Sequence, residues 1–61
     1  MVNEFIFMGP KVPNWSIDLT IGKKYSVNKR LNIGIASIRD DINDNVFIYI
    51  NSLYQYFKEV K

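Results

Sequence analysis

Hydrophobic residues are concentrated in four stretches of this chain, at residues 2–8, 24–30, 33–39 and 46–50, and each stretch predicts a β-strand. In residues 24–30 they alternate with polar residues, and alternation with a period of two is typical of a strand that has one face in a core. Residues 58–61 are expected to add a short last strand. The apolar side chains of residues 33–39 change face near Ala36 and Ser37, which predicts a bulge or bend there.

Residues 46–50 are apolar on both faces. This composition suits a strand that is buried on two sides, as in a barrel. A second interpretation stays open: the rest of the fold covers only one face, and the other forms an exposed apolar patch. In that case the strand invites a second copy of the chain or another partner.

The segments between these strands carry turn and helix signals. Residues 11–19 are expected to form a long ordered loop in which Trp15 folds back over the core, because exposing so large an apolar side chain is costly. Residues 40–45 are rich in Asp and Asn, which predicts a hairpin loop. Ser52 and Gln55 fit a capping box and predict one helical turn, of 3₁₀ type, before the last strand.

The most informative segment joins a loop to the second strand. Gly22 is the residue that allows a positive φ at this point, so it is expected to set where the strand begins. The segment reads Leu19-Thr20-Ile21-Gly22-Lys23-Lys24-Tyr25-Ser26-Val27. Further along the chain stand Ile38-Arg39-Asp40-Asp41, an aromatic strand around Phe47 and Tyr49, and Phe57.

Together these residues resemble the small Src-homology-3-type barrels of phages and prophages of Gram-positive bacteria. The resemblance covers residues 19–60 and implies a phage-like origin. It also implies an all-β fold, a five-stranded Src-homology-3-like barrel with a short 3₁₀ turn before the last strand, and we expect one domain over residues 1–61. The chain departs from the family pattern after Asp41, where the usual glycine is missing and Asn43 and Asn45 stand nearby.

The composition restricts the chemistry. The 61 residues contain neither cysteine nor histidine, so disulfides, thiol catalysis and the commonest metal ligand are excluded. Asp40 and Asp41 are adjacent on a strand, point to opposite faces and do not form a catalytic pair. Asp41, Asn43 and Asn45 imitate the opening of a calcium loop, but Val46 and Ser52 stand where that loop needs glycine and glutamate. No enzyme activity, cofactor or metal is therefore expected.

The charge is unevenly distributed. Residues 1–30 hold five basic and two acidic side chains, whereas residues 31–61 hold three basic and four acidic ones. Basic residues beside aromatic ones suit single-stranded nucleic acid. The candidates for this alternative function are Lys23, Lys24, Lys29 and Arg30, which surround Tyr25. The competing interpretation is a solvated strand whose charges discourage edge pairing.

The aromatic residues least bound to the predicted strands are Trp15, Tyr54 and Tyr56. Aromatic side chains are frequent at binding hot spots, so these three are the candidate partner-binding residues. The competing interpretation is that they close the ends of the barrel. The expected function is non-enzymatic protein–protein binding by a phage-type protein that modulates or inhibits a host factor. The expected partner is a host or phage protein, and a homodimer is a further alternative.

The sequence has no stretch near the length of a membrane span and no recognisable signal peptide at its start. The expected location is therefore the cytoplasm, which for a phage-encoded chain is that of the host cell.

Overall fold

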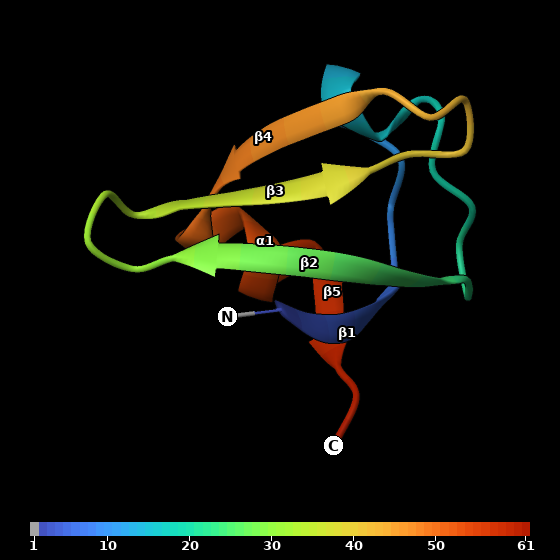
Figure 1. Ribbon diagram of the computed structural model, residues 1–61. Helices are drawn as coiled ribbons and strands as arrows, with labels where there is room; N and C mark the ends of the chain where they lie inside the picture. Colours follow the sequence, from blue (N-terminus) through green and yellow to red (C-terminus); the bar gives the residue numbers. More distant parts are fainter. Residues whose placement is uncertain (1) are drawn as a thin grey trace.

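A computed structural model describes residues 2–61 of the chain and the side chains of residues 3–61. In chain order the elements are β1 (Val2–Phe7), η1 (Asn14–Ser16), β2 (Lys24–Arg30), β3 (Ile35–Arg39), β4 (Asn45–Tyr49), α1 (Ile50–Tyr56) and β5 (Phe57–Glu59) (Figure 1). The five predicted strands, their order and a helical element before the last of them are confirmed. Among the described residues, no helix has the length and apolar character needed to cross a membrane.

The strands form one antiparallel sheet in the order β4-β3-β2-β1-β5. β1 pairs with β2 on one side and with β5 on the other, so the first and last strands are neighbours. β4 and β5 lie at the two edges and do not pair with each other. The fold is therefore a small, mainly antiparallel β fold, and its hydrogen-bonded sheet is open.

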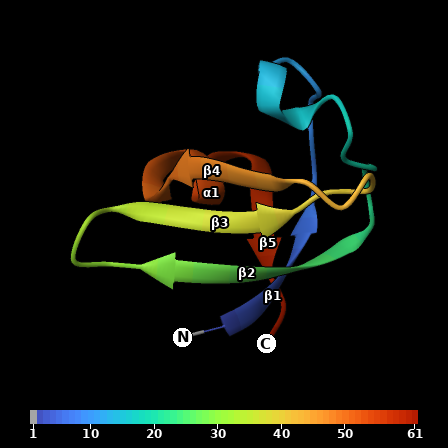
Figure 2. The same cartoon turned by 45° about the horizontal axis from the view of Figure 1, so that its top comes forward.

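One face of the sheet carries the core. Figure 1 shows α1 behind β2 and β3, on this side of the sheet, and Figure 2 shows it behind β4. Leu53 is the buried residue of α1, and it joins the core residues that alternate along the strands. The core consists of Phe5, Phe7, Leu19, Tyr25, Val27, Ala36, Ile38, Ile48, Leu53 and Phe57.

The loop that contains η1 closes one end of this core. The Trp15 ring lies 6.4 Å from the Phe7 ring and 6.2 Å from the Phe57 ring, measured between centroids. The side chain is half-buried and packs against the core cluster. The prediction that Trp15 folds back over the core is confirmed.

The helix before β5 differs from the prediction. It is a seven-residue α-helix that starts at Ile50, and Tyr49 is its N-cap residue without a side-chain cap. The capping box expected at Ser52 and Gln55 is therefore wrong. The reason is that β4 leads directly into the helix: the N–H of Ile50 still donates to the carbonyl of Gly34, 2.9 Å away, so Ser52 already lies inside the first turn.

The bulge expected near Ala36 and Ser37 is also absent. β3 pairs without interruption with β2 and with β4 along this stretch. Ile33 lies in the turn before the strand, and Gly34 has a φ of 71°. The change of face seen in the sequence therefore belongs to the turn, where a glycine accepts a positive φ.

Candidate functional site

The segment of residues 19–27 is joined to the β3–β4 turn through the carboxylate of Asp41. Asp41 accepts hydrogen bonds from Thr20 Oγ1 at 2.6 Å, Lys23 Nζ at 2.7 Å and Tyr25 OH at 2.9 Å. The backbone N–H of Asp41 donates to the carbonyl of Asp18 at 3.0 Å. We call Thr20, Lys23, Tyr25 and Asp41 the Asp41 junction.

The charges in this junction favour an ionised carboxylate. The hydrogen bond from Lys23, followed by those from Thr20 and Tyr25, lowers the pKa of Asp41 from 3.8 to about 2. The same contact with Asp41 raises the pKa of Lys23. Burial is the main cause that raises the pKa of Tyr25. All three shifts keep the junction in one protonation state near neutral pH.

The two aspartates of the turn have different partners. Asp40 Oδ1 accepts the N–H groups of Ile42 at 3.1 Å and Asp44 at 2.9 Å, so Asp40 caps the turn. Asp41 is instead held by Thr20, Lys23 and Tyr25. Asn43 takes a φ of 68° in this turn, a conformation that asparagine tolerates better than most residues. The residues on which the resemblance rests therefore join the loop before β2 to the turn between β3 and β4.

The candidate partner-binding aromatics fall into two places. Trp15 and Tyr56 meet edge to face at 5.4 Å, and both are half-buried against the core. Tyr54 lies against Phe5, with ring centroids 5.8 Å apart, and its hydroxyl accepts a hydrogen bond from Lys29 at 2.9 Å. Tyr54 is 52% exposed, so it is the most accessible of the three.

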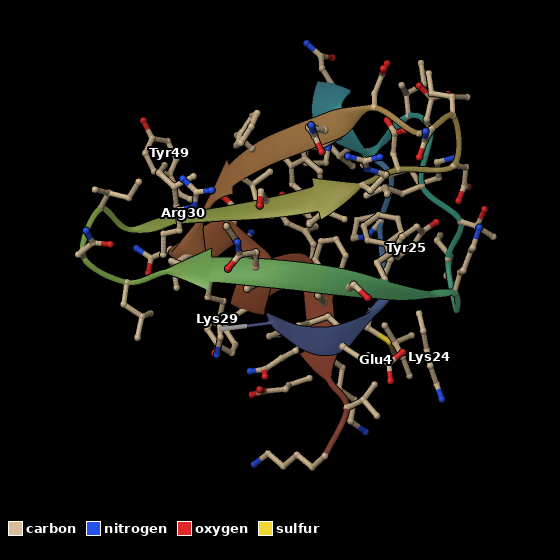
Figure 3. All side chains as sticks on the ribbon, viewed as in Figure 1. Glu4, Lys24, Tyr25, Lys29, Arg30 and Tyr49 are labelled. Atoms are coloured by element: carbon tan, nitrogen blue, oxygen red, sulfur yellow. The ribbon has the colours of Figure 1, made fainter. Side chains whose placement is uncertain are left out.

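The candidate nucleic-acid-binding residues are likewise separated. Lys23 belongs to the Asp41 junction. Lys29 lies on the core side of β2, 3.8 Å from a carboxylate oxygen of Glu59, and its Nζ stands 5.6 Å from the centroid of the Phe5 ring. Lys24 and Arg30 lie on the opposite side of β2 because side chains alternate along a strand (Figure 3). The structure therefore leaves two of the four on a common face.

That face is the side of β2, β3 and β4 turned away from the core, and we call it the outer face. It carries three basic side chains and no acidic one. The neighbouring strand β1 adds one acidic side chain to this side of the sheet: Glu4 is exposed, is opposite Ser26 in the register and lies beside Lys24 in Figure 3. The outer face consists of Lys24, Ser26, Asn28, Arg30, Ile35, Ser37, Arg39, Asn45, Phe47 and Tyr49.

Two large aromatic side chains stand exposed on this face. Phe47 is 64% exposed and Tyr49 is 71% exposed, whereas Ile48 between them is buried. The interpretation of residues 46–50 as a strand buried on both sides is therefore wrong, and the exposed-patch interpretation describes β4. Residues two apart on a strand are separated by about 6.6 Å, so the two rings are neighbours along the exposed face of β4.

The register places positive charge beside these rings. Arg30 is opposite Ile35, and Ile35 is opposite Tyr49, so the three residues form one row across the outer face. Figure 3 shows Arg30 and Tyr49 at the end of the sheet where the β2–β3 turn lies. Arg39 lies towards the other end of β3 and donates to Asn43 and Asn45 at 3.3 and 3.4 Å.

Sequence reasoning omitted Phe47, Tyr49 and Arg39 from its candidate residues. The signal in the sequence was that residues 46–50 are apolar on both faces. The rest of the fold covers only one of these faces, so the other face is exposed. Among the described residues, no three His, Cys, Asp or Glu side chains gather as metal ligands, and no pocket opens at the surface of this part of the chain. The candidate site is thus an open face.

Comparisons with protein-family models, with curated protein sequences and with solved structures found no match for this chain.

Proposed function

We propose that the chain is a small Src-homology-3-like protein of phage type, without catalytic activity, that binds single-stranded nucleic acid on its outer face. The order of the elements supports the assignment of fold type, because the chain has five strands with a helical element before the last one, as the resemblance implies. The proposed location is the cytoplasm of the host cell. The observation that carries the function is the exposed pair Phe47 and Tyr49 on a face where β2, β3 and β4 carry basic and no acidic side chains.

The spacing of the two rings favours a single strand over a duplex. Bases in a duplex follow one another at about 3.4 Å along each strand. Phe47 and Tyr49 are separated by about twice that distance. Two successive bases that stack on these rings must therefore be unstacked from each other, which a single strand allows and a duplex resists.

The basic side chains of the outer face supply the contacts to phosphate. Arg30 lies in the row of Tyr49, Arg39 lies beside Asn45, and Lys24 is at the far end of β2. All three are exposed, and no salt bridge engages Arg30 or Lys24 in the described part of the chain. A backbone that passes along β4 therefore meets positive charge at both ends of the aromatic pair.

Fluorescence anisotropy with labelled oligothymidylate, oligouridylate and a DNA duplex tests this proposal. We expect the single strands to bind more tightly than the duplex, with a slope of log affinity against log salt of about −2 if three phosphates are contacted. The double variant Phe47→Ser/Tyr49→Ser should weaken binding at least about tenfold, because each stacked base contributes about 1–3 kcal/mol. Ile17→Ser is the matched control, since Ile17 is 73% exposed in the loop after η1. Equal affinities of the double variant and the wild type would refute the proposal.

A second candidate function is binding to a host or phage protein, which would modulate or inhibit a host factor. The observation that favours it is Tyr54, whose ring is half exposed although it is fixed between Phe5 and Lys29. A rigid, exposed tyrosine is typical of a protein-binding hot spot. This function predicts a complex that tolerates salt and depends on Tyr54, whereas nucleic-acid binding predicts the opposite in both respects.

A further inference from the structure

The free edge of the sheet at β4 offers a second binding surface. β4 is the last strand on its side of the sheet, and its five residues contain no charge and no proline. The other edge strand, β5, has only three residues, of which Lys58 and Glu59 are charged. Proteins usually protect sheet edges with charges, prolines, bulges or very short strands. β5 has such protection and β4 does not.

The backbone hydrogen bonds show which groups of β4 are free. Ile50 donates to Gly34 and Asp40 donates to Asp44, and both pairs continue the register of β3 with β4. Hydrogen-bonded and non-hydrogen-bonded pairs alternate in an antiparallel ladder. Val46 and Ile48 therefore direct their backbone groups to β3. The N–H groups of Asn45, Phe47 and Tyr49 point to the free edge.

We propose that two copies of this chain pair through their β4 strands, antiparallel and with Phe47 on the two-fold axis. This register places Phe47 opposite Phe47 of the second copy and Val46 opposite Ile48. It also places Asn45 opposite Tyr49, so each free N–H of the edge meets a carbonyl. The strand is complementary to itself because no like charges oppose each other in this pairing.

The pairing also extends the outer face. Directly opposed residues of antiparallel strands lie on the same side of a sheet. The outer faces of the two copies therefore become continuous, and the Phe47–Tyr49 pairs of both chains form one aromatic strip at the centre of a ten-stranded sheet. The dimer does not depend on nucleic-acid binding, although it would double the length of the strip.

Light scattering during size-exclusion chromatography, from low micromolar to about 1 mM chain, measures the association, because a short edge pairing is expected to be weak. Hydrogen–deuterium exchange of ¹⁵N-labelled chain, followed by NMR, locates it. We expect the mass to approach twice that of the monomer and the Phe47 amide to become protected as concentration rises. A monomer at every concentration would overturn the proposal. So would a dimer in which the Phe47 amide stays unprotected.

Phe47→Pro removes the N–H at the centre of the edge without removing a bond to β3, and proline is accepted on such edges. Phe47→Thr is the matched control because it loses the ring but keeps the N–H and a strand-forming side chain. We expect Phe47→Pro to weaken dimerisation about tenfold or more relative to Phe47→Thr. Equal dimerisation of the two would contradict the proposal. If Phe47→Pro does not fold, the amide exchange of the wild type decides the matter alone.

These results are separable from the proposed function. The double variant Phe47→Ser/Tyr49→Ser keeps every backbone N–H of the edge, so it tests stacking on bases. Phe47→Pro tests pairing of the edge. A chain that binds oligonucleotide as a monomer would leave the proposed function intact and overturn the dimer.

Discussion

The hydroxyl of Tyr25 gives the sharpest test of how the Asp41 junction holds the fold. Tyr25 is only 5% exposed, and its hydroxyl accepts the N–H of Thr20 at 2.7 Å and donates to Asp41 at 2.9 Å. Tyr25→Phe removes this oxygen and leaves the ring in place. The N–H of Thr20 then loses its acceptor in a part-buried place, which costs about 1–2 kcal/mol. The exposed carboxylate of Asp41 regains water, so its loss adds little.

A change of this size is large for a chain of 61 residues. For a domain of this length, 1 kcal/mol corresponds to roughly 4–8 °C in Tm, so we expect Tyr25→Phe to melt about 5–15 °C lower. Urea unfolding followed by the fluorescence of Trp15 measures the change directly, because Trp15 packs on Phe57 in the folded state. The slope of the transition should not change.

The control is Tyr49→Phe, the same chemical change at a tyrosine that is 71% exposed. The hydroxyl of Tyr49 has no partner among the described residues, so this variant should stay within about 0.5 kcal/mol of the wild type. If Tyr25→Phe is no less stable than Tyr49→Phe, the Tyr25 hydroxyl does not hold the junction together, and the argument for it is wrong.

Two further predictions concern Asp41 and the glycines at positive φ. The pKa of Asp41 is lowered to about 2, so its ionised form stabilises the fold above its unfolded pKa near 3.8, and this contribution is lost as the pH falls towards 2. The difference in unfolding free energy between the wild type and Asp41→Asn should therefore be constant above about pH 5 and shrink below about pH 4. Urea unfolding at a series of pH values measures it. A difference that grows as the pH falls would contradict this. Gly22→Val should destabilise the fold by about 1–2 kcal/mol in thermal melts, because φ is 89° at this position; a Cβ there would meet nothing within 4 Å, so the cost comes from the backbone conformation. Gly34 has a φ of 71°, and Gly34→Asn should cost less because asparagine tolerates this region. Equal losses would mean that backbone strain does not decide either position.

The strands and turns were largely predictable because they depend on local patterns. The bounds of β2 match the alternation of residues 24–30, and Gly22 takes the expected positive φ. The turn at residues 40–45 follows from the Asp and Asn side chains, of which Asp40 accepts the N–H groups of the turn. The start of α1 was not predictable from its own residues. It is set by the ladder between β3 and β4, which continues to Ile50.

The candidate site was less predictable because it depends on which face the rest of the fold covers. Lys29 and Arg30 are neighbours in the chain, yet one packs beside Tyr54 and Glu59 and the other belongs to the outer face. Phe47 and Ile48 differ in the same way. A strand with apolar residues on both faces does not show which face is exposed. That is decided by the return of α1 and β5 to one side.

The central claim is that the outer face binds single-stranded nucleic acid. The most direct measurement is an NMR titration of ¹⁵N-labelled chain with unlabelled oligothymidylate. We expect the amide shifts to change along β2–β4, at Asn28, Ser37, Phe47 and Tyr49, while the amides of Trp15 and Tyr56 stay in place. Shifts confined to Trp15, Tyr54 and Tyr56, or no shifts at low salt, would contradict the account.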